Sequence, residues 1–528
     1  MCREVPRGPG FFGDAGPQPA KGLAVLQDDG PSDETLVVHA GEKLGNGVAS
    51  TDSILAPIMV GTSQWFKNSD DLIDFKEGRC VGGFEYGRYG NPTLKEANYI
   101  GPGSFTNQKR PPSPCAMCIF TISKQQILSG LAQHCNAAIL SSQSGATSSF
   151  PLDHWRRRLA RSKGDVTEEH RTLSFANVLE DKISALEKAE STLVTSSGMN
   201  AIAATLLALV PPGGHVVTTN DCYSEAGAFI SDRLSGMGIR STFIDLDDME
   251  LSLKAVLDQN DILPANKYQL YVTELLSSQH TLQVTLFYTD SPTNPLLKCV
   301  DIRLVTEMCH RKGALVCVDS TLASPVNQKP LTLGADIVLH SATKFIAGHH
   351  DVIAGCVSGS DVLISRIRLW HHHLGGAISP NSAYMIIRGL KTMALRVEAQ
   401  NYTALRIACL LECHPKIERV HYPGLKSCPW HHIAEIQMAG CGGVLSFEVA
   451  SDLYGTMRFI DALKIPFIAT SFGGCESLVQ QPAVMSFWGQ SEDRMAKMGI
   501  KNNLVRFSVG IEKFEDIRDD ILQALDKV

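Results

Sequence analysis

The chain has 528 residues, of which 44% are hydrophobic and 20% are charged, and this composition is typical of globular proteins rather than of wholly disordered chains. Its 55 Asp and Glu residues outnumber its 48 Lys and Arg residues, for a formal net charge of -7, which argues against a nucleic-acid-binding protein. The sequence has no apolar run of about 18 residues or more, so we expect no membrane-spanning helix.

The first 32 residues are rich in Gly and Pro and also contain acidic residues, including Asp14, Asp28 and Asp29. Plastid and mitochondrial transit peptides are instead rich in Ser and Arg and poor in acidic residues. We therefore expect residues 1–32 to form a disordered leader with no clear transit peptide. The 15 cysteines are scattered along the chain, which is typical of a reducing compartment.

Residues 94–177 show no sustained helical or strand periodicity and contain Pro-rich, Ser-rich and basic stretches. Irregular connections longer than about 15 residues are uncommon inside compact domains. We interpret 94–177 as an inserted, largely disordered segment that follows an N-terminal arm at 33–93. Its Cys115 and Cys118 have no second pair of ligands at a zinc-binding spacing, so no metal site is predicted.

Residues 178–375 alternate between helical and strand patterns. The segment 178–190 has apolar residues at helical spacing, and short runs rich in β-branched residues follow it. These runs are HVVTTN (215–220), STFIDL (241–246), VTLFYTD (284–290), ALVCVD (314–319) and ADIVLH (335–340). Because such runs between helical segments are typical of buried parallel strands, we predict a large α/β domain with a mostly parallel central sheet.

Residues 376–528 have a different pattern, with helices expected near 381–413 and after Glu512 and a Gly-rich strand at 442–450. We predict that this region is a smaller α+β domain packed on the larger one. Three consecutive histidines, at 371–373, lie just before it. Consecutive residues point in different directions on a helix, so we expect these histidines to be solvated or subunit-facing rather than to bind a metal.

A lysine and two hydroxyl residues stand at the end of one predicted strand. Lys344 follows Ser341 and Thr343 in the segment VLHSATKFIAGHHDVIAG. Partial burial at this place would lower the pKa of the amine and make it a nucleophile, and the two hydroxyls suit a phosphate group. Taken alone, the same residues would also fit an exposed lysine at the end of a strand.

Two other segments fit the same site. Asp319 ends the predicted strand ALVCVD, where a carboxylate could keep a pyridine nitrogen protonated, although an Asp that caps the next helix is the commoner case. Gly198 and Met199 follow Ser197 at a predicted helix N-terminus, whose free amides bind anions. Ordinary N-capping by Ser197 is the alternative, so the evidence lies in the order of these features along the chain.

Seven motifs resemble those of the Cys/Met-metabolism enzymes that depend on pyridoxal 5'-phosphate (PLP). They are YGRYGNPT (86–93), SSGM (196–199), SPTNP (291–295), VDST (318–321), HSATKF (340–345), SFGGCESL (471–478) and NLVRFSVG (503–510). The resemblance covers residues 33–93 and 178–528, and it implies the fold of the PLP-dependent transferases of fold type I. Two segments, 94–177 and 268–283, interrupt it, and we interpret both as translated intron sequence or recent insertions.

The resemblance also implies roles for individual residues. Lys344 would bind PLP covalently and act in catalysis, Asp319 would pair with the pyridine nitrogen, and Tyr223 would stack on the ring. Further cofactor contacts are implied for Gly198, Met199, Asn294, Ser341 and Thr343. Substrate contacts are implied for Tyr223, Glu476, Ser477 and Arg506, of which the arginine would grip the substrate α-carboxylate. Tyr86 and Arg88 would reach the cofactor phosphate of a neighbouring subunit, which implies a homodimer at least and usually a homotetramer.

Within the family, the chain most resembles the plant members that make L-cystathionine by γ-replacement. In that reaction an activated homoserine ester, O-phosphohomoserine in plants, reacts with L-cysteine on the route to methionine. We therefore expect small amino-acid substrates, no nucleic acid and no membrane, and a plastid or cytoplasmic location. The alternatives are a methionine or cystathionine γ-lyase on the same scaffold, or a catalytically impaired paralogue.

One position bears on the choice between synthase and lyase, and two others depart from the family pattern. Bacterial methionine γ-lyases typically carry a cysteine where this chain has Glu225, which favours the synthetic reaction. Asp290 and His350 depart from the family pattern, in which Glu and Asn are common at these positions.

Overall fold

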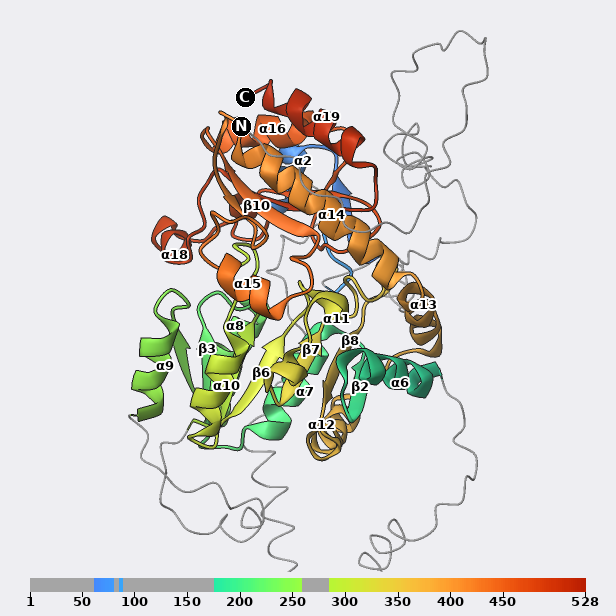
Figure 1. Cartoon of the computed structure of the whole chain (residues 1–528), viewed down its shortest axis with the longest axis vertical. Helices are drawn as coiled ribbons and strands as arrows, with labels where there is room; N and C mark the ends of the chain where they lie inside the picture. Colours follow the sequence, from blue (N-terminus) through green and yellow to red (C-terminus); the bar gives the residue numbers. More distant parts are fainter. Residues whose placement is uncertain (1–60, 80–84, 89–174, 259–283) are drawn as a thin grey trace, which may run out of the picture.

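The computed structural model describes residues 61–79, 85–88, 175–258 and 284–528, which form two domains shown one above the other in Figure 1. The expectations for the leader, for most of 94–177, for 268–283 and for Cys115 and Cys118 lie outside the described residues. The predicted end of the insertion at 177 is wrong, because residues 175–177 form the start of helix α6. The division of the chain at 375 and 376 stays a prediction.

The large domain contains a seven-stranded sheet in the order β2-β8-β7-β6-β5-β3-β4. Five of its strands run parallel, and they are the five predicted from sequence: β3 (His215–Thr219), β4 (Arg240–Ile244), β5 (Leu286–Asp290), β6 (Leu315–Asp319) and β7 (Ile337–His340). Two further strands were not predicted, β2 (Ser191–Thr195) and β8 (Gly355–Gly359), and both are antiparallel to their neighbours. The mostly parallel α/β sheet is thereby confirmed.

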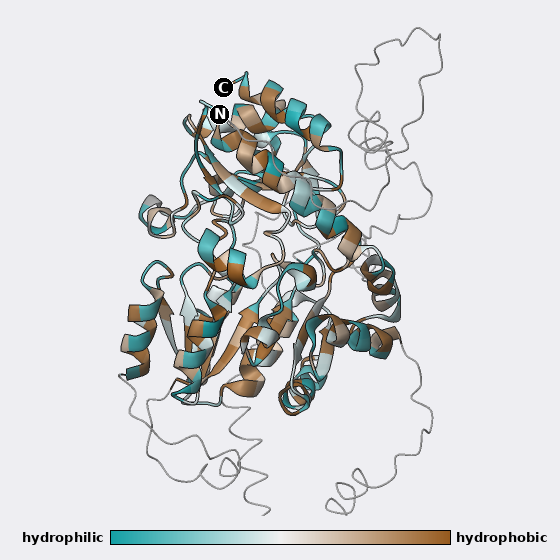
Figure 2. Cartoon of the chain, in the orientation of Figure 1, coloured by the Kyte–Doolittle hydropathy of each residue, from teal (hydrophilic) through white to brown (hydrophobic). Residues whose placement is uncertain are grey.

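Helices cover both faces of this sheet because the parallel strands are apolar on both sides. Val216, Leu286 and Cys317 pack towards one set of helices, whereas the alternating Val217 and Phe287 pack towards another. The helices are α6 (Phe175–Glu187), α7 (Gly198–Leu209), α8 (Ser224–Ala228), α9 (Met249–Asp258), α10 (Ile302–His310), α11 (Ser324–Asn327) and α12 (Asp361–Leu374). Figure 2 shows the hydrophobic residues concentrated on the strands and on the helix sides turned towards them.

The smaller domain contains a six-stranded sheet in the order β1-β11-β12-β13-β10-β9. Its strands are β1 (Trp65–Phe66), β9 (Ile417–His421), β10 (Val444–Val449), β11 (Phe467–Ala469), β12 (Leu478–Gln480) and β13 (Leu504–Ser508). Its helices are α13 (Pro380–Leu390), α14 (Met393–Glu412), α15 (His431–Gln437), α16 (Leu453–Ala462), α17 (Pro482–Met485), α18 (Glu492–Lys497) and α19 (Phe514–Leu525). These elements confirm the predicted helices near 381–413 and after Glu512 and the predicted strand at 442–450.

Part of the N-terminal arm belongs to this smaller domain. Strand β1 pairs with β11, and helix α2 (Ser69–Lys76) packs beside α16 and α17. Asn68 caps α2 through a hydrogen bond from the Asp71 N–H to its side chain, 2.8 Å long. The backbone N–H of Ser69 donates to Asp461 of α16, so the arm is attached to the sheet and to a helix of its own chain.

Candidate active site

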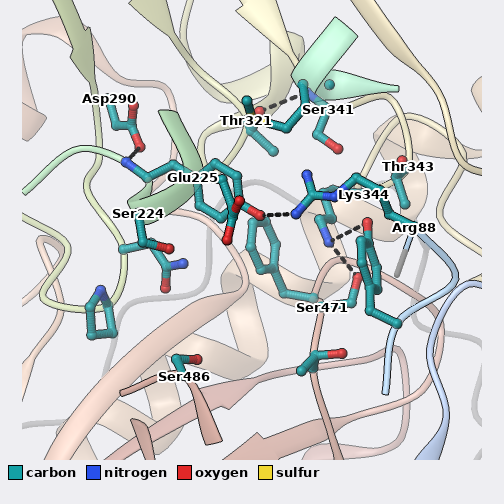
Figure 3. A pocket seen from close by; sticks show the side chains of 18 of the residues that line it. Arg88, Ser224, Glu225, Asp290, Thr321, Ser341, Thr343, Lys344, Ser471 and Ser486 are labelled. Atoms are coloured by element: carbon teal, nitrogen blue, oxygen red, sulfur yellow. Dashed lines mark hydrogen bonds between the residues drawn. The ribbon is translucent and has the colours of Figure 1, made fainter. Parts of the chain in front are cut away.

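A cavity of about 260 Å³ lies where the C-terminal ends of β5, β6 and β7 face the smaller domain. This is the edge at which parallel α/β sheets usually bind ligands. Figure 3 shows residues from both domains pointing into it. The predicted site residues that line it are Tyr86, Arg88, Gly198, Met199, Tyr223, Asn294, Asp319, Ser341, Thr343, Lys344 and Arg506.

Lys344 lies in the turn after β7 and extends its amine into the cavity (Figure 3). Its Nζ is 2.6 Å from the hydroxyl oxygen of Ser471 and 3.4 Å from that of Tyr86. Burial, followed by the positive charges of Arg506 and Arg88, holds the pKa of Lys344 well below its ordinary value. A neutral amine is therefore accessible, and this is the form that attacks a carbonyl carbon.

Two carboxyl groups stand side by side where β5 and β6 end. Asp319 pairs in register with Asp290, and Thr321 donates both its N–H (2.9 Å) and its hydroxyl (2.5 Å) to Asp319 Oδ1. Asp290 accepts the backbone N–H of Tyr223 at 2.8 Å. Burial raises the pKa of both carboxyls, and for Asp290 the neighbouring Asp319 raises it further.

The N-terminus of α7 meets the turn after β7. Ser197 caps the helix by accepting the N–H of Asn200, so the N-capping that the sequence also allowed is present, and Gly198 and Met199 after it line the cavity. A Cβ added to Gly198 would lie 3.0 Å from the Ser341 Cβ, so glycine allows this close approach. The amides of the first helical turn and the Ser341 side chain thus face one part of the cavity.

The Thr343 hydroxyl, by contrast, is engaged within the protein. It donates to the carbonyl oxygen of Ala354 at 3.1 Å and accepts the Ala354 N–H. Thr343 still lines the cavity, and its two bonds to Ala354 fix the turn that carries Lys344.

Tyr86 and Arg88 occupy the cavity of their own chain. The arm reaches this place because Thr62 donates its N–H to the carbonyl of His350 and accepts that of Gly87. Arg88 Nη2 is 2.6 Å from the hydroxyl oxygen of Tyr223. Burial raises the pKa of Tyr86 to about 12. The expected contribution of these two residues to a neighbouring subunit stays a prediction, because a single chain is described.

Arg506 enters the cavity from β13 in the smaller domain. Its Nη1 lies 3.2 Å from Asn294 Oδ1, and its Nη2 lies 2.6 Å from the carbonyl oxygen of Ser471. Burial lowers the pKa of this guanidinium, so an anionic ligand would be favourable beside it. Ser471 therefore contacts both the predicted nucleophile and the predicted carboxylate-binding group.

Two predicted substrate residues lie apart from the cavity lining. Ser477 is fully buried, and its N–H and hydroxyl both bond to Glu512 at 2.7 Å and 2.9 Å. Glu476 has its Oε2 3.8 Å from the Nε2 of His350. Burial, followed by the charge of Lys344, lowers the pKa of His350 to about 4, so this pair contains a neutral imidazole at neutral pH.

Sequence reasoning missed Ser471 and Thr321, although both lie in motifs that it recognised. Ser471 opens SFGGCESL and has a φ of 79°, in the left-handed region that non-glycine residues rarely adopt. Nothing in the sequence marks that backbone conformation, which the surrounding structure must hold in place.

Comparisons with known proteins agree with this geometry. The model of the Cys/Met metabolism PLP-dependent enzyme family matches residues 145–526. The chain belongs to this family. Among its relatives, the chloroplastic cystathionine γ-synthase 1 of Nicotiana tabacum is 47% identical over 497 residues, which cover 94% of this chain and 72% of the relative. The L-methionine γ-lyase of Fusobacterium nucleatum subsp. polymorphum is 39% identical over 66% of this chain and 84% of its own length.

Solved structures of the family show the same fold. The cystathionine γ-synthase of Xanthomonas oryzae pv. oryzae, in complex with aminoacrylate and cysteine, matches with a TM-score of 0.60 and 32% identity. The match covers 67% of this chain and 85% of that structure. The expected fold, a PLP-dependent transferase of fold type I, is thereby confirmed.

The residues present fit the PLP that this family uses. A desolvated lysine amine, a carboxyl at the end of β6, an aromatic ring and a helix N-terminus open to an anion all line the same cavity. These four features match the aldehyde, the ring nitrogen, the ring face and the phosphate of PLP.

In the part of the chain that the structure describes, no helix is long and apolar enough to cross a membrane. In the same residues, no three His, Cys, Asp or Glu side chains gather as a metal site would require.

Proposed function

We propose that this chain catalyses γ-replacement, in which an activated homoserine ester and L-cysteine give L-cystathionine. The observation that carries the proposal is the bridge at Ser471, which contacts both Lys344 and Arg506. A nucleophilic amine and a guanidinium are thus held together in one cavity, as an α-amino-acid substrate requires. The relatives named cystathionine γ-synthase support the reaction, since they are more similar to this chain than the γ-lyase is.

Each side chain then has a physical task. Bound PLP supplies an electron sink, which permits proton removal at Cα and loss of the substituent at Cγ. Arg506 binds the α-carboxylate through the N–H groups that Asn294 and Ser471 leave available. The Lys344 amine, oriented by the Ser471 hydroxyl, accepts and returns the protons. Burial lowers the pKa of this amine, which favours the neutral form that accepts a proton.

The carboxyl and aromatic residues hold the cofactor in position. Asp319, fixed by two hydrogen bonds from Thr321, would bind the ring nitrogen. Tyr223, fixed by its backbone bond to Asp290 and its hydroxyl bond to Arg88, would cover the ring face. The phosphate would be held by Gly198, Met199 and the hydroxyls of Ser341 and Thr343. The Thr343 hydroxyl already bonds to Ala354, so its contact with the phosphate would be additional to those bonds.

Assembly and location are part of the same proposal. We infer a homotetramer built from dimers, with Tyr86 and Arg88 able to serve a neighbouring cavity. Light scattering of the purified protein measures this directly. We also infer a plastid location, which the chloroplastic relatives of Nicotiana tabacum and Arabidopsis thaliana support. Imaging of a fluorescent fusion tests it.

The decisive experiment replaces the nucleophile. Lys344→Ala should lower cystathionine formation by more than about 1,000-fold, because the amine acts both as nucleophile and as proton carrier. It should also lower the PLP content while circular dichroism stays unchanged. Lys182→Ala, at an exposed position on α6, is the matched control and should behave as wild type.

The outcomes separate the candidates. Residual activity of Lys344→Ala within tenfold of wild type would refute the role of this lysine. Faster release of a 2-oxo acid from methionine or cystathionine than formation of cystathionine would identify a γ-lyase. A protein that binds PLP but turns over no substrate would be the impaired paralogue.

A further inference from the structure

A histidine of the HSATKF motif has no task in the proposed function. His340 ends β7, one residue before Ser341, and is almost fully buried. Its Nε2 lies 2.6 Å from Oε1 of Glu187, the last residue of α6, which is fully buried as well. An imidazole and a carboxyl group are therefore in contact inside the large domain, and neither belongs to the cavity lining.

This buried pair is not a good source of stability. Glu187 Oε2 and His340 Nδ1 have no hydrogen-bond partner among the described residues. Polar atoms that are buried without partners oppose folding, and well-packed apolar side chains in place of a buried ion pair are often as stable or more stable. The surroundings of the pair indicate a different role.

Two other titratable groups lie near Glu187. The Lys329 amine donates to the carbonyl oxygens of Leu186 and Pro325, and burial lowers its pKa, an effect that the charge of Glu187 partly offsets. Burial, followed by the charges of Glu187 and Asp319, raises the pKa of the Cys356 thiol well above its ordinary value, so this thiol is neutral. Among the described residues, His340 is therefore the group that shares a proton with Glu187.

A short series of hydrogen bonds links the pair to Asp319. The backbone N–H of Ser341, which directly follows His340, donates to the Thr321 hydroxyl oxygen at 2.8 Å (Figure 3). The Thr321 hydroxyl in turn donates to Asp319 Oδ1 at 2.5 Å. Because Glu187 holds the end of β7 through His340, it also fixes the N–H that orients the Thr321 hydroxyl.

The charge of the imidazole acts in the same direction. Burial raises the pKa of Asp319, whereas the hydrogen bonds from Thr321 and then the charge of His340 lower it. The ionised form of Asp319 is the one that keeps a pyridine nitrogen protonated. A pair that keeps positive charge at His340 therefore favours the form of Asp319 that the cofactor requires.

We propose that Glu187 and His340 are a positioning pair for Asp319, through which they control how firmly this chain holds the ring nitrogen of PLP. The inference rests on one part of the proposed function, the placement of Asp319 at that nitrogen. It is independent of which donor or which reaction the enzyme uses, so it is tested on the bound cofactor and not on turnover.

The test uses the full chain with bound PLP. Glu187→Gln keeps the size of the side chain and removes its charge. The dissociation constant for PLP, measured by equilibrium dialysis, should rise about tenfold or more, since a hydrogen bond between charged groups is lost.

The absorbance of bound PLP gives a second readout. Its pH titration should have a midpoint that is higher by about half a pH unit or more in Glu187→Gln, because a less firmly protonated ring nitrogen withdraws less charge from the group joined to Lys344. An unshifted midpoint would overturn the inference, whatever the affinity for PLP. Absence of γ-replacement in a wild-type protein that binds PLP would refute the proposed reaction and leave this titration decisive for the pair.

A second pair of the same kind separates positioning from stability. His421 and Glu448 make the same contact at 3.0 Å in the smaller domain, and Glu448 is likewise buried and outside the cavity lining. Glu448→Gln should lower the melting temperature and leave both PLP readouts unchanged. Equal shifts of the titration midpoint in the two variants would overturn the assignment, since lost stability would then explain both.

Two further variants test the route from the pair to the cofactor. In an Asp319→Asn background, Glu187→Gln should change the dissociation constant for PLP by less than about twofold, because the carboxylate on which the pair acts is gone. Thr321→Val removes the connecting hydroxyl and should raise the titration midpoint as Glu187→Gln does, which keeps the inference testable if Glu187→Gln does not fold. An equally large effect of Glu187→Gln with and without Asp319, or an unshifted midpoint in Thr321→Val, would overturn the inference.

Discussion

Replacement of Arg506 by lysine tests whether this residue binds the α-carboxylate of the substrate. Arginine offers five N–H donors in a planar fork, and the structure commits one to Asn294 Oδ1 at 3.2 Å and one to the Ser471 carbonyl at 2.6 Å. The rest can bind a carboxylate in bidentate fashion. Lysine keeps the charge but offers three donors from one atom, so at least one charge-assisted hydrogen bond to the substrate is lost. That loss is worth about 1.5 to 3 kcal/mol.

The expected result is a fall in kcat/KM of about 10- to 150-fold, since about 1.4 kcal/mol corresponds to a factor of ten. Steady-state kinetics with the donor ester varied at fixed L-cysteine measure it. Arg518→Lys on the exposed side of α19 controls for the loss of a guanidinium, and PLP content and circular dichroism check the fold. A change below threefold in a variant that binds PLP normally would refute the role of Arg506.

Two further predictions concern Ser471 and Glu448. Ser471→Ala removes the hydrogen bond to the Lys344 amine. This variant should lower kcat about 10- to 100-fold with little change in KM, and the pH profile of kcat should shift. A kcat near that of wild type with an unshifted pH profile would contradict the prediction. Burial raises the pKa of Glu448, but hydrogen bonds from His421 and Lys501 outweigh burial and lower this pKa from 4.5 to about 2. The ionised Glu448 therefore stabilises the fold above pH 4.5, and this stabilisation is lost as the pH falls from 4.5 towards 2. Because Lys501 is exposed and solvent weakens its ion pair, Glu448→Gln should lower the free energy of unfolding by about 1 to 2 kcal/mol at pH 7. The difference in melting temperature between wild type and this variant should be smaller at about pH 3.5. Glu435→Gln on α15 is the control, and a difference that does not change with pH would contradict the assignment.

The parallel strands and the residues at their ends could be predicted because both depend on local sequence. Each of β3 to β7 is a short β-branched run, and their shared C-terminal edge follows from parallel pairing. That edge brings Asp319 and Lys344 into one cavity without any knowledge of side-chain contacts. The strand β8, with the sequence GCVSG, could not be predicted, because glycine and serine have low strand propensity and its burial comes from β2 and β7 on either side.

Side-chain direction within a loop could not be predicted. Glu476 and Ser477 belong to the same motif as Ser471, yet Ser471 faces Lys344 while Ser477 turns to Glu512. The difference depends on the left-handed backbone of Ser471 and on the position of Glu512, 35 residues further along the chain. A motif therefore identifies a loop that lines the cavity, whereas the tertiary packing decides which of its side chains faces the cavity.

The same contacts couple the substrate to the arrangement of the two domains. Asn294 follows β5 of the large domain, while Arg506 and Ser471 belong to the smaller one. Arg506 reaches across to Asn294, and Ser471 reaches across to Lys344, so contacts between the two domains set the spacing of the predicted nucleophile and the predicted carboxylate-binding group. A substrate that bridges Lys344 and Arg506 would add its own binding energy to these contacts.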